Sequence, residues 1–297
     1  MFALPSIPQP FQCRLRLFAI GSILLIAAFS ITLVDLAGYC LREDLFSYIL
    51  LVPFVTGFLI SCCWRDLEMT YSPAKGVAAI LGALAGLFLI MSFLHAKPEE
   101  VVTLAWRMPA FVFGWIAISV WALGGRFMRG VVFPAGFLLF MTPLPPELVQ
   151  LIEHGLQHAS AEVSAWLFSL TGIPFFRTGL SFQLPNVTLE VAPECSGIRS
   201  SLVLFITSLV AGKVLLERPW QRAALTLLVI PLGIFRNAFR IVTLGWLCTH
   251  HGAEMIHSPI HHRGGPVFFA ISLLPLLAML VVFRMLGKRD ARRKTEN

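Results

Sequence analysis

The chain has 297 residues, of which 57% are hydrophobic and 13% are charged, and its mean hydropathy is +0.79. This exceeds the apolar content of an ordinary soluble domain, so the composition excludes that class and indicates an integral membrane protein. The net charge of +7 fits membrane topology and contact with anionic lipid, and it gives no reason to expect a nucleic acid as partner.

Apolar segments recur along the whole chain, each about long enough to cross the ~30 Å hydrocarbon layer as a helix. We predict an all-α polytopic membrane protein, with a single integral membrane domain over residues 1–297. Eight transmembrane helices are expected near residues 17–36, 45–63, 76–94, 109–124, 131–148, 198–214, 222–248 and 266–286. The first is expected to be retained rather than cleaved as a signal peptide, and prolines break the end of the fifth.

The distribution of Lys and Arg predicts the orientation of these helices, because basic residues favour the cytoplasmic side of short loops. Placing both termini in the cytoplasm puts most of the 23 basic residues on that side. They are Arg14, Arg16, Arg65, Lys75, Arg126, Arg129, Lys213, Arg218, Arg222, Arg284, Lys288, Arg289, Arg292, Arg293 and Lys294. We therefore expect a multi-pass protein of the inner (plasma) membrane, with all eight histidines and Cys195 on the extracytoplasmic side.

The longest extracytoplasmic segment, residues 149–197, has two parts. From Leu148 to Leu170, apolar residues at helical spacing predict an amphipathic helix lying along the membrane interface. After Pro174 the apolar residues alternate with polar ones, on both sides of Pro185-Asn186. This alternation predicts a short β-hairpin before the sixth helix, which would deliver Cys195 to the membrane surface.

Five of the six cysteines fall in or beside apolar segments, and their spacing fits neither a zinc site nor a disulfide framework. These are Cys13, Cys40, Cys62, Cys63 and Cys248, and we interpret them as packing residues. A disulfide between Cys40 and Cys248 is compatible with the predicted topology, although nothing in the sequence brings the two together. Cys195 differs because of its neighbours.

Cys195 belongs to the short polar segment Ala192-Pro193-Glu194-Cys195-Ser196-Gly197, directly before an apolar helix. Pro193 favours a non-helical approach, and Glu194 or Ser196 could cap the helix. The amide N–H groups and positive dipole end of that helix favour a thiolate, whereas a free thiol has a pKa of about 8.5. The pattern indicates a nucleophile, and the alternative is a small residue packed at a helix start.

A second polar cluster, Arg236-Asn237-Ala238-Phe239-Arg240-Ile241, lies within the apolar segment 222–248. An arginine inside the bilayer costs at least ~2.5 kcal/mol on insertion scales, so it normally faces a polar interior and marks function. Arg236 and Arg240 share a helix face at i, i+4, and Asn237 lies beside Arg240 at i, i+3. For Arg236, snorkelling or pairing with an acid such as Glu194 is an equally good interpretation.

A third cluster, His257-Ser-Pro-Ile-His261-His262-Arg263, precedes the last helix. Imidazole, with a pKa near 6.5, can take a proton from a thiol and return it to a leaving group. Three histidines within six residues, together with His154 and His158 at i, i+4, could instead bind a metal. Because Pro259 disrupts a helical pair and no carboxylate follows in a metalloprotease pattern, we expect neither a metal nor another cofactor.

These clusters resemble the three signature blocks of the exosortase/archaeosortase family. The matching segments are 192–200, 236–241 and 261–269, which follow the family's order, and residues 44–53 resemble a further block near the family's N-terminus. The resemblance covers nearly the whole chain. It departs at the third block, where His262 could take the role of His261 and Pro266 stands where many relatives carry another residue.

Members of that family are polytopic membrane cysteine proteases, proposed to act as transpeptidases. They recognise membrane-anchored secreted proteins by a C-terminal sorting signal (PEP-CTERM): a short motif, often Pro-Glu-Pro-like, then a transmembrane helix and a basic tail. The resemblance implies that this chain cleaves such a signal on the extracytoplasmic side through a thioester acyl-enzyme. Water or an unknown acceptor nucleophile would then resolve that intermediate.

The resemblance assigns the nucleophile to Cys195, the stabilisation of the oxyanion or the substrate to Arg240, and the proton transfers to His261. Supporting candidates are Glu194, Ser196, Arg199, Arg236, Asn237 and His262. The chain ends soon after the last helix, so we expect a stand-alone enzyme that acts within the lipid bilayer.

Two other classes of function remain open from the residues alone. A non-enzymatic membrane scaffold or transporter would use the polar clusters for helix packing or a solute path, although no internal repeat supports a transporter. A membrane metalloprotease would use the histidines, and it would lose activity to chelators but survive Cys195→Ala. A cysteine enzyme would instead keep its activity in the presence of chelators and lose it on Cys195→Ala.

Overall fold

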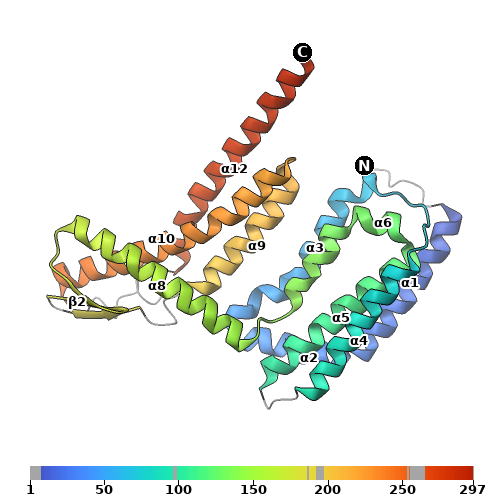
Figure 1. Cartoon of the computed structure of the whole chain (residues 1–297), viewed down its shortest axis with the longest axis horizontal. Coiled ribbons are helices and arrows are strands. Elements are labelled where there is room, and N and C mark those ends of the chain that lie inside the picture. Colours follow the sequence, from blue (N-terminus) through green and yellow to red (C-terminus); the bar gives the residue numbers. More distant parts are fainter. Residues whose placement is uncertain are drawn as a thin grey trace. The chain divides into compact units, whose positions relative to one another are not determined.

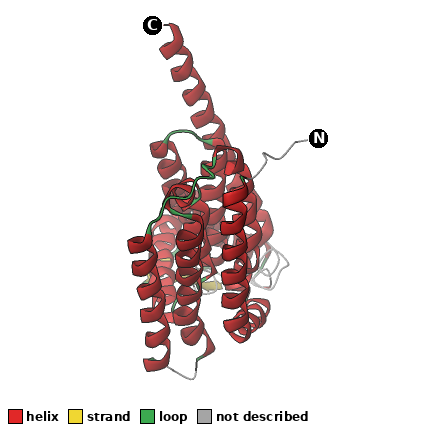
Figure 2. Cartoon of the chain, turned by 90° about the vertical axis from the view of Figure 1, so that its right-hand side faces the viewer, coloured by secondary structure: helices red, strands yellow, loops and turns green. Residues whose placement is uncertain are grey.

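The computed structural model describes residues 8–95, 99–185, 187–191, 197–252, 254 and 265–296, with side chains in the last segment from 267 to 287. Helix accounts for most of this part of the chain, and one small sheet accompanies it (Figure 2). By length and composition, seven of the described helices can cross a membrane, or eight if two consecutive segments on either side of a break form one span. The predicted polytopic helical architecture is confirmed.

The chain divides into two compact units, Met1–Pro146 and Glu147–Asn297. The first unit is built only from helices in its described part, with short 3-10 segments (η) between some of them (Figure 1). They are α1 (Gln9–Ala28), α2 (Ser30–Arg42), η1 (Asp44–Leu51), α3 (Val52–Cys63), η2 (Trp64–Asp66), α4 (Lys75–Leu94), α5 (Glu100–Leu123), α6 (Gly125–Gly130), α7 (Val132–Phe137) and η3 (Leu138–Met141).

The first apolar helix differs from its predicted range of 17–36. It begins at Gln9 and is interrupted at Phe29, whose φ of −100° and ψ of 13° leave the helical region. Backbone hydrogen bonds nevertheless bridge the interruption, from the Phe29 N–H to the Leu25 carbonyl at 3.0 Å and from the Leu33 N–H to the Phe29 carbonyl at 2.9 Å. Hydropathy alone does not report such a local change in backbone dihedral angles.

The fourth predicted helix also begins earlier than expected, at Glu100 rather than near residue 109. Pro109 lies inside α5, where it removes one backbone hydrogen bond without ending the helix. The added turns at its start contain Glu100, whose carboxylate accepts two hydrogen bonds from Arg42, at 2.9 and 2.8 Å. This exposed ion pair links the end of α2 to the beginning of α5.

The second unit contains both the helices and the sheet that surround the predicted site. Its elements are α8 (Pro146–Thr171), β1 (Phe176–Thr178), β2 (Ser181–Leu184), β3 (Val187–Glu190), α9 (Ile198–Leu215), α10 (Pro219–His251) and α12 (Gly265–Glu296). The fifth predicted span, 131–148, does not continue as one helix, because the helical segment ends at Met141 and α8 begins at Pro146. Pro143 and Pro145 separate the two, as proline ends helices.

The predicted hairpin is confirmed as strands β2 and β3, which pair antiparallel with Phe182 opposite Leu189 and Leu184 opposite Val187. A third strand, β1, adds to the free edge of β2. Along β2 and β3 the buried residues Phe182, Leu184 and Leu189 alternate with exposed polar ones. The period of two therefore gives the sheet one apolar face and one polar face.

The apolar face of the sheet packs on α8 and on the C-terminal half of α10. Three rings form the centre of this core: Phe168 lies 5.6 Å from Phe175 and 5.5 Å from Phe182 between centroids. Cys248 is fully buried in the same core and is a free thiol, as is Cys40 in the first unit. Cys248 thus has the packing role expected from the sequence.

Helices α9, α10 and α12 share a second apolar core in this unit (Figure 1). Leu204 of α9 and Leu225 of α10 are fully buried there, against Leu276 of α12. With 33 residues, α10 is about 50 Å long at 1.5 Å per residue, which exceeds the ~30 Å of the hydrocarbon layer. Its first part therefore packs within the helical core, while its last part reaches the sheet.

Candidate functional site

Helices α9 and α10 approach each other closely where the predicted polar clusters lie. A Cβ atom at Gly233 of α10 would lie 2.6 Å from Oγ of Ser201 in α9, so only glycine allows this separation without rearrangement. Helix α8 lies against the next turn of α10, where Nδ2 of Asn237 donates a hydrogen bond to Oγ of Ser160 at 3.1 Å. Both of these side chains are buried. Three helices thus meet around residues 233–237.

The two ends of the predicted nucleophile segment are each held by hydrogen bonds. Residues 192–196, which include Cys195, lie outside the described part of the chain. On one side, the Val191 N–H donates to the Leu180 carbonyl at 3.0 Å, and the Val191 carbonyl accepts from Nε2 of the buried Gln157 at 2.9 Å. This end of the segment is therefore tied to the sheet and to α8.

On the other side, Gly197 is the N-cap residue directly before α9 and is tied to α10. Its carbonyl accepts hydrogen bonds from the Ser201 N–H and from Oγ of Ser200, both at 3.0 Å, and from Nη2 of Arg236 at 3.3 Å. Its φ of +72° is left-handed, and a Cβ there would lie 2.9 Å from Nη2 of Arg236. The backbone conformation thus favours glycine at this position, and a side chain there would also displace the guanidinium of Arg236.

Arg236 is the buried charge of this region, with only 8% of its surface exposed. Its Nη2 binds the Gly197 carbonyl, whereas its buried Nη1 has no hydrogen-bond partner among the described residues. The side chain is packed between helices and does not snorkel to the surface. Burying a hydrogen-bond donor of a charged group without an acceptor lowers the stability of the fold. The pairing of Arg236 with Glu194 stays a prediction, because Glu194 lies outside the described residues.

Arg240 lies one turn further along α10 with its side chain half-buried, and Arg199 is exposed in the first turn of α9. The structure thus brings together Gly197, Arg236 and Asn237 from the first two predicted clusters. The roles of the residues outside the described part of the chain stay predictions. These are Glu194, Cys195, Ser196, His261 and His262.

Two polar residues of α8 were missed by sequence reasoning. Gln157 and Ser160 are both buried, and they bind Val191 and Asn237, respectively. They lie three residues apart and so share one face of the helix. Polar residues of an interfacial helix are expected to face water, and only the packing of α8 on α10 and the sheet turns this pair inward.

The electrostatics of this region favour negative charge. The N-terminus of α9 presents the positive end of the helix dipole, and the Arg236 guanidinium lies within hydrogen-bond distance of Gly197, the residue that caps this end of the helix. An anion next to Gly197 would gain from both effects. Such an arrangement suits chemistry in which a thiolate or an oxyanion develops.

The fold and this region together define the class of protein, a multi-pass helical membrane protein with a buried polar cluster where its spanning helices meet. The chain belongs to the transmembrane exosortase family, because the family model described as transmembrane exosortase (Exosortase_EpsH) matches residues 40–278. No curated protein and no solved structure matches the chain significantly. The match covers α9 and α10 completely, and it covers the first part of α12.

Proposed function

We propose that the chain is a cysteine endopeptidase and transpeptidase that removes the C-terminal sorting signal from membrane-anchored secreted proteins. Its substrates carry a Pro-Glu-Pro-like motif, a transmembrane helix and a basic tail, and the reaction takes place on the extracytoplasmic side of the plasma membrane. Membership of the exosortase family supports the class of reaction. The assignment of residues rests on the three sequence clusters.

The observation that carries the proposal is the hydrogen bond from Arg236 to the Gly197 carbonyl. Gly197 follows Cys195 by two residues, and Arg236 precedes Arg240 by one helical turn. The bond therefore ties the segment of the nucleophile to the helix that carries the proposed oxyanion-binding arginine. The buried Asn237–Ser160 bond holds the same turn of α10 against α8.

In the proposed mechanism, His261 accepts the proton of the Cys195 thiol, and the thiolate attacks the scissile carbonyl carbon. Arg240 stabilises the negative charge that develops on the carbonyl oxygen. Collapse of the tetrahedral intermediate breaks the C–N bond, His261 gives its proton to the leaving amine, and a thioester to Cys195 remains. Water or an acceptor amine then attacks the thioester and regenerates the thiol.

The experiment that tests this function is co-expression with a secreted protein that bears a candidate C-terminal signal, with the product mass as readout. The wild-type chain should release the substrate from its terminal helix, and Cys195→Ala should abolish that release. Cys62→Ala is the matched control, because Cys62 is an exposed free thiol of α3 outside the site, and it should process at the wild-type rate. Processing that survives Cys195→Ala would rule out the nucleophile.

Chelation separates the cysteine enzyme from a metalloprotease built on the histidines. Processing in membranes treated with a metal chelator should proceed unchanged, because no step of the proposed mechanism uses a metal. Loss of processing on chelation, with recovery when zinc is restored, would instead favour the metalloprotease.

A further inference from the structure

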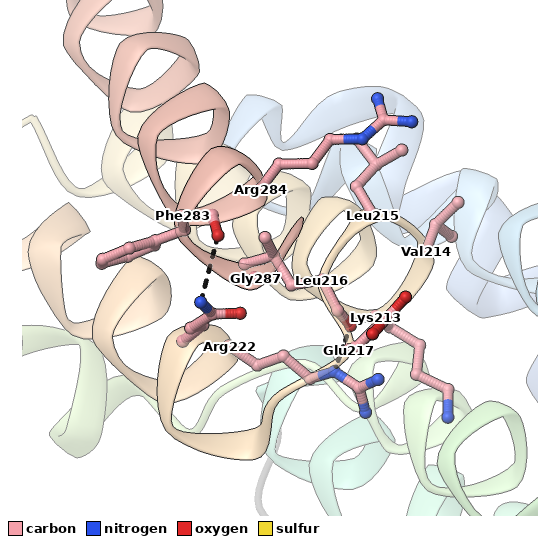
Figure 3. A pocket seen from close by; sticks show the side chains of 10 residues that line it. Lys213, Val214, Leu215, Leu216, Glu217, Arg222, Phe283, Arg284 and Gly287 are labelled. Atoms are coloured by element: carbon pink, nitrogen blue, oxygen red, sulfur yellow. Dashed lines mark hydrogen bonds between the residues drawn. The ribbon is translucent and has the colours of Figure 1, made fainter. Parts of the chain in front are cut away.

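A cavity of about 400 Å³ lies at the end of the second unit's helical core, where α9, α10 and α12 meet. Three basic side chains line it, one from each helix: Lys213, Arg222 and Arg284 (Figure 3). One carboxylate, Glu217, accompanies them. The cavity therefore has an excess of positive charge, and its size suits a phosphate group with part of a lipid headgroup.

The walls of the cavity are held by bonds between the helices and the turn that joins them. Nε of Arg222 donates to the Leu216 carbonyl at 2.8 Å, which fixes the guanidinium at the cavity and leaves its terminal N–H groups for another acceptor. Gln221 is buried and donates from Nε2 to the Phe283 carbonyl at 3.0 Å. This second bond ties α10 to α12, and Figure 3 shows both bonds.

The position of the cavity along α9 places it at a membrane surface. Gly197 caps the first turn of α9, and Lys213 and Leu215 lie in its last turn, so the 18 residues of this helix lie between the predicted catalytic end and the cavity. At 1.5 Å per residue this helix is about 27 Å long, close to the thickness of the hydrocarbon layer. The two sites thus lie at opposite membrane surfaces, and the positive-inside rule assigns the cavity to the cytoplasmic one.

Apolar side chains next to the cavity face outward, as expected where lipid chains begin. Val214 and Leu215 line the cavity and are 42% and 40% exposed, and the neighbouring Trp220 is 52% exposed. Trp220 packs edge-on against Phe283, with 5.5 Å between ring centroids. Tryptophan at this level is typical of a membrane interface. The cavity thus has basic side chains next to an exposed apolar surface. An anionic phospholipid has the complementary arrangement, a negatively charged headgroup next to apolar acyl chains.

We propose that this cavity binds the phosphate group of an anionic phospholipid in the cytoplasmic leaflet. Arg222, Arg284 and Lys213 bind the phosphate oxygens, and the exposed apolar residues contact the upper acyl chains. Basic pockets between transmembrane helices on the cytoplasmic side bind anionic headgroups by this chemistry. Because the lipid contacts all three helices, its binding stabilises their packing.

The test uses the full chain purified in a neutral detergent, with phosphatidylglycerol, phosphatidylcholine and inorganic phosphate as three separate probes. Phosphatidylglycerol should raise the unfolding temperature of the wild type in a saturable way and stay bound in native mass spectrometry. Phosphatidylcholine and inorganic phosphate should do neither. If inorganic phosphate alone reproduces the whole effect, or phosphatidylcholine equals phosphatidylglycerol, the lipid site is refuted.

Variants that remove one charge from the cavity provide a second test, because loss of a basic residue and loss of the acidic residue should change the affinity for phosphatidylglycerol in opposite directions. Arg284→Gln and Lys213→Gln should each weaken phosphatidylglycerol binding about fivefold, and Glu217→Gln should strengthen it by a similar factor. Arg16→Gln is the matched control, because Arg16 is an exposed cation of α1 outside the cavity, and it should leave the affinity unchanged. Equal weakening by Arg16→Gln and Arg284→Gln would mean that only overall charge attracts the lipid, which would refute the proposal.

Discussion

Replacing Gly197 by alanine tests the junction between the predicted nucleophile segment and α10. Alanine in the left-handed region costs about 1–2 kcal/mol, and Gly197 has a φ of +72°. The new Cβ would also lie 2.9 Å from Nη2 of Arg236, so the guanidinium must move and lose its bond to the Gly197 carbonyl. A hydrogen bond to a charged group is worth ~1.5–3 kcal/mol, and at 3.3 Å the lower value applies.

We therefore expect Gly197→Ala to reduce the free energy of unfolding by roughly 2.5–3.5 kcal/mol, the sum of the two effects. Unfolding of the purified chain in mixed micelles, followed by tryptophan fluorescence during titration with sodium dodecyl sulfate, measures this loss. The rate of substrate processing should fall as well, because the ends of the Cys195 segment are no longer held in place.

Gly172 provides the matched control, since its φ is also +72° but no atom lies within 4 Å of an added Cβ. Gly172→Ala should therefore show only the backbone cost of about 1–2 kcal/mol and keep its processing activity. In an Arg236→Gln background, the extra cost of Gly197→Ala over Gly172→Ala should shrink. Equal losses for the two glycine variants in the wild-type background would refute the importance of the Arg236 contact.

Two further predictions concern the packing of α10 on α8, and the same unfolding assay measures both. Asn237→Ala and Ser160→Ala should each lower the free energy of unfolding by about 1–3 kcal/mol, since each leaves a buried polar partner without its hydrogen bond. The double variant should lose clearly less than the sum of the two single losses. Strictly additive losses would mean that the bond contributes nothing. Gly245→Ala places a Cβ 2.6 Å from Cζ of the fully buried Phe168, and this overpacking should cost about 1–3 kcal/mol. In a Phe168→Leu background, Gly245→Ala should cost less unfolding free energy. An equal cost in that background would show that another contact opposes the added methyl group.

Hydropathy and alternation predicted the elements of the second unit well, because those patterns report which faces must avoid water. The helix expected at 198–214 is observed as α9, Ile198–Leu215, and the hairpin is observed as β2 and β3. The helix follows from a continuous apolar segment long enough to span the membrane, and the strands follow from the alternation of apolar and polar residues. Apolar burial therefore fixes the type of the element and nearly fixes its ends.

The first unit shows where hydropathy stops being informative. Prolines marked the break after Met141 correctly, yet Pro109 lies inside α5 without ending it, and Phe29 interrupts a run that contains no proline or glycine at that position. A proline acts as a helix breaker only when the neighbouring packing does not compensate for the lost hydrogen bond. That compensation depends on residues far away in the chain.

By itself, the sequence determined that the protein spans a membrane, where most of its apolar helices lie, and which three clusters carry its unusual polar residues. These properties follow from local composition and period, and each can be decided within about twenty residues. The tertiary structure alone decided that Arg236 binds the carbonyl of Gly197, and that Gln157 and Ser160 of α8 turn inward. Such contacts join residues 34 to 77 positions apart, and only close helix packing brings them within hydrogen-bond distance.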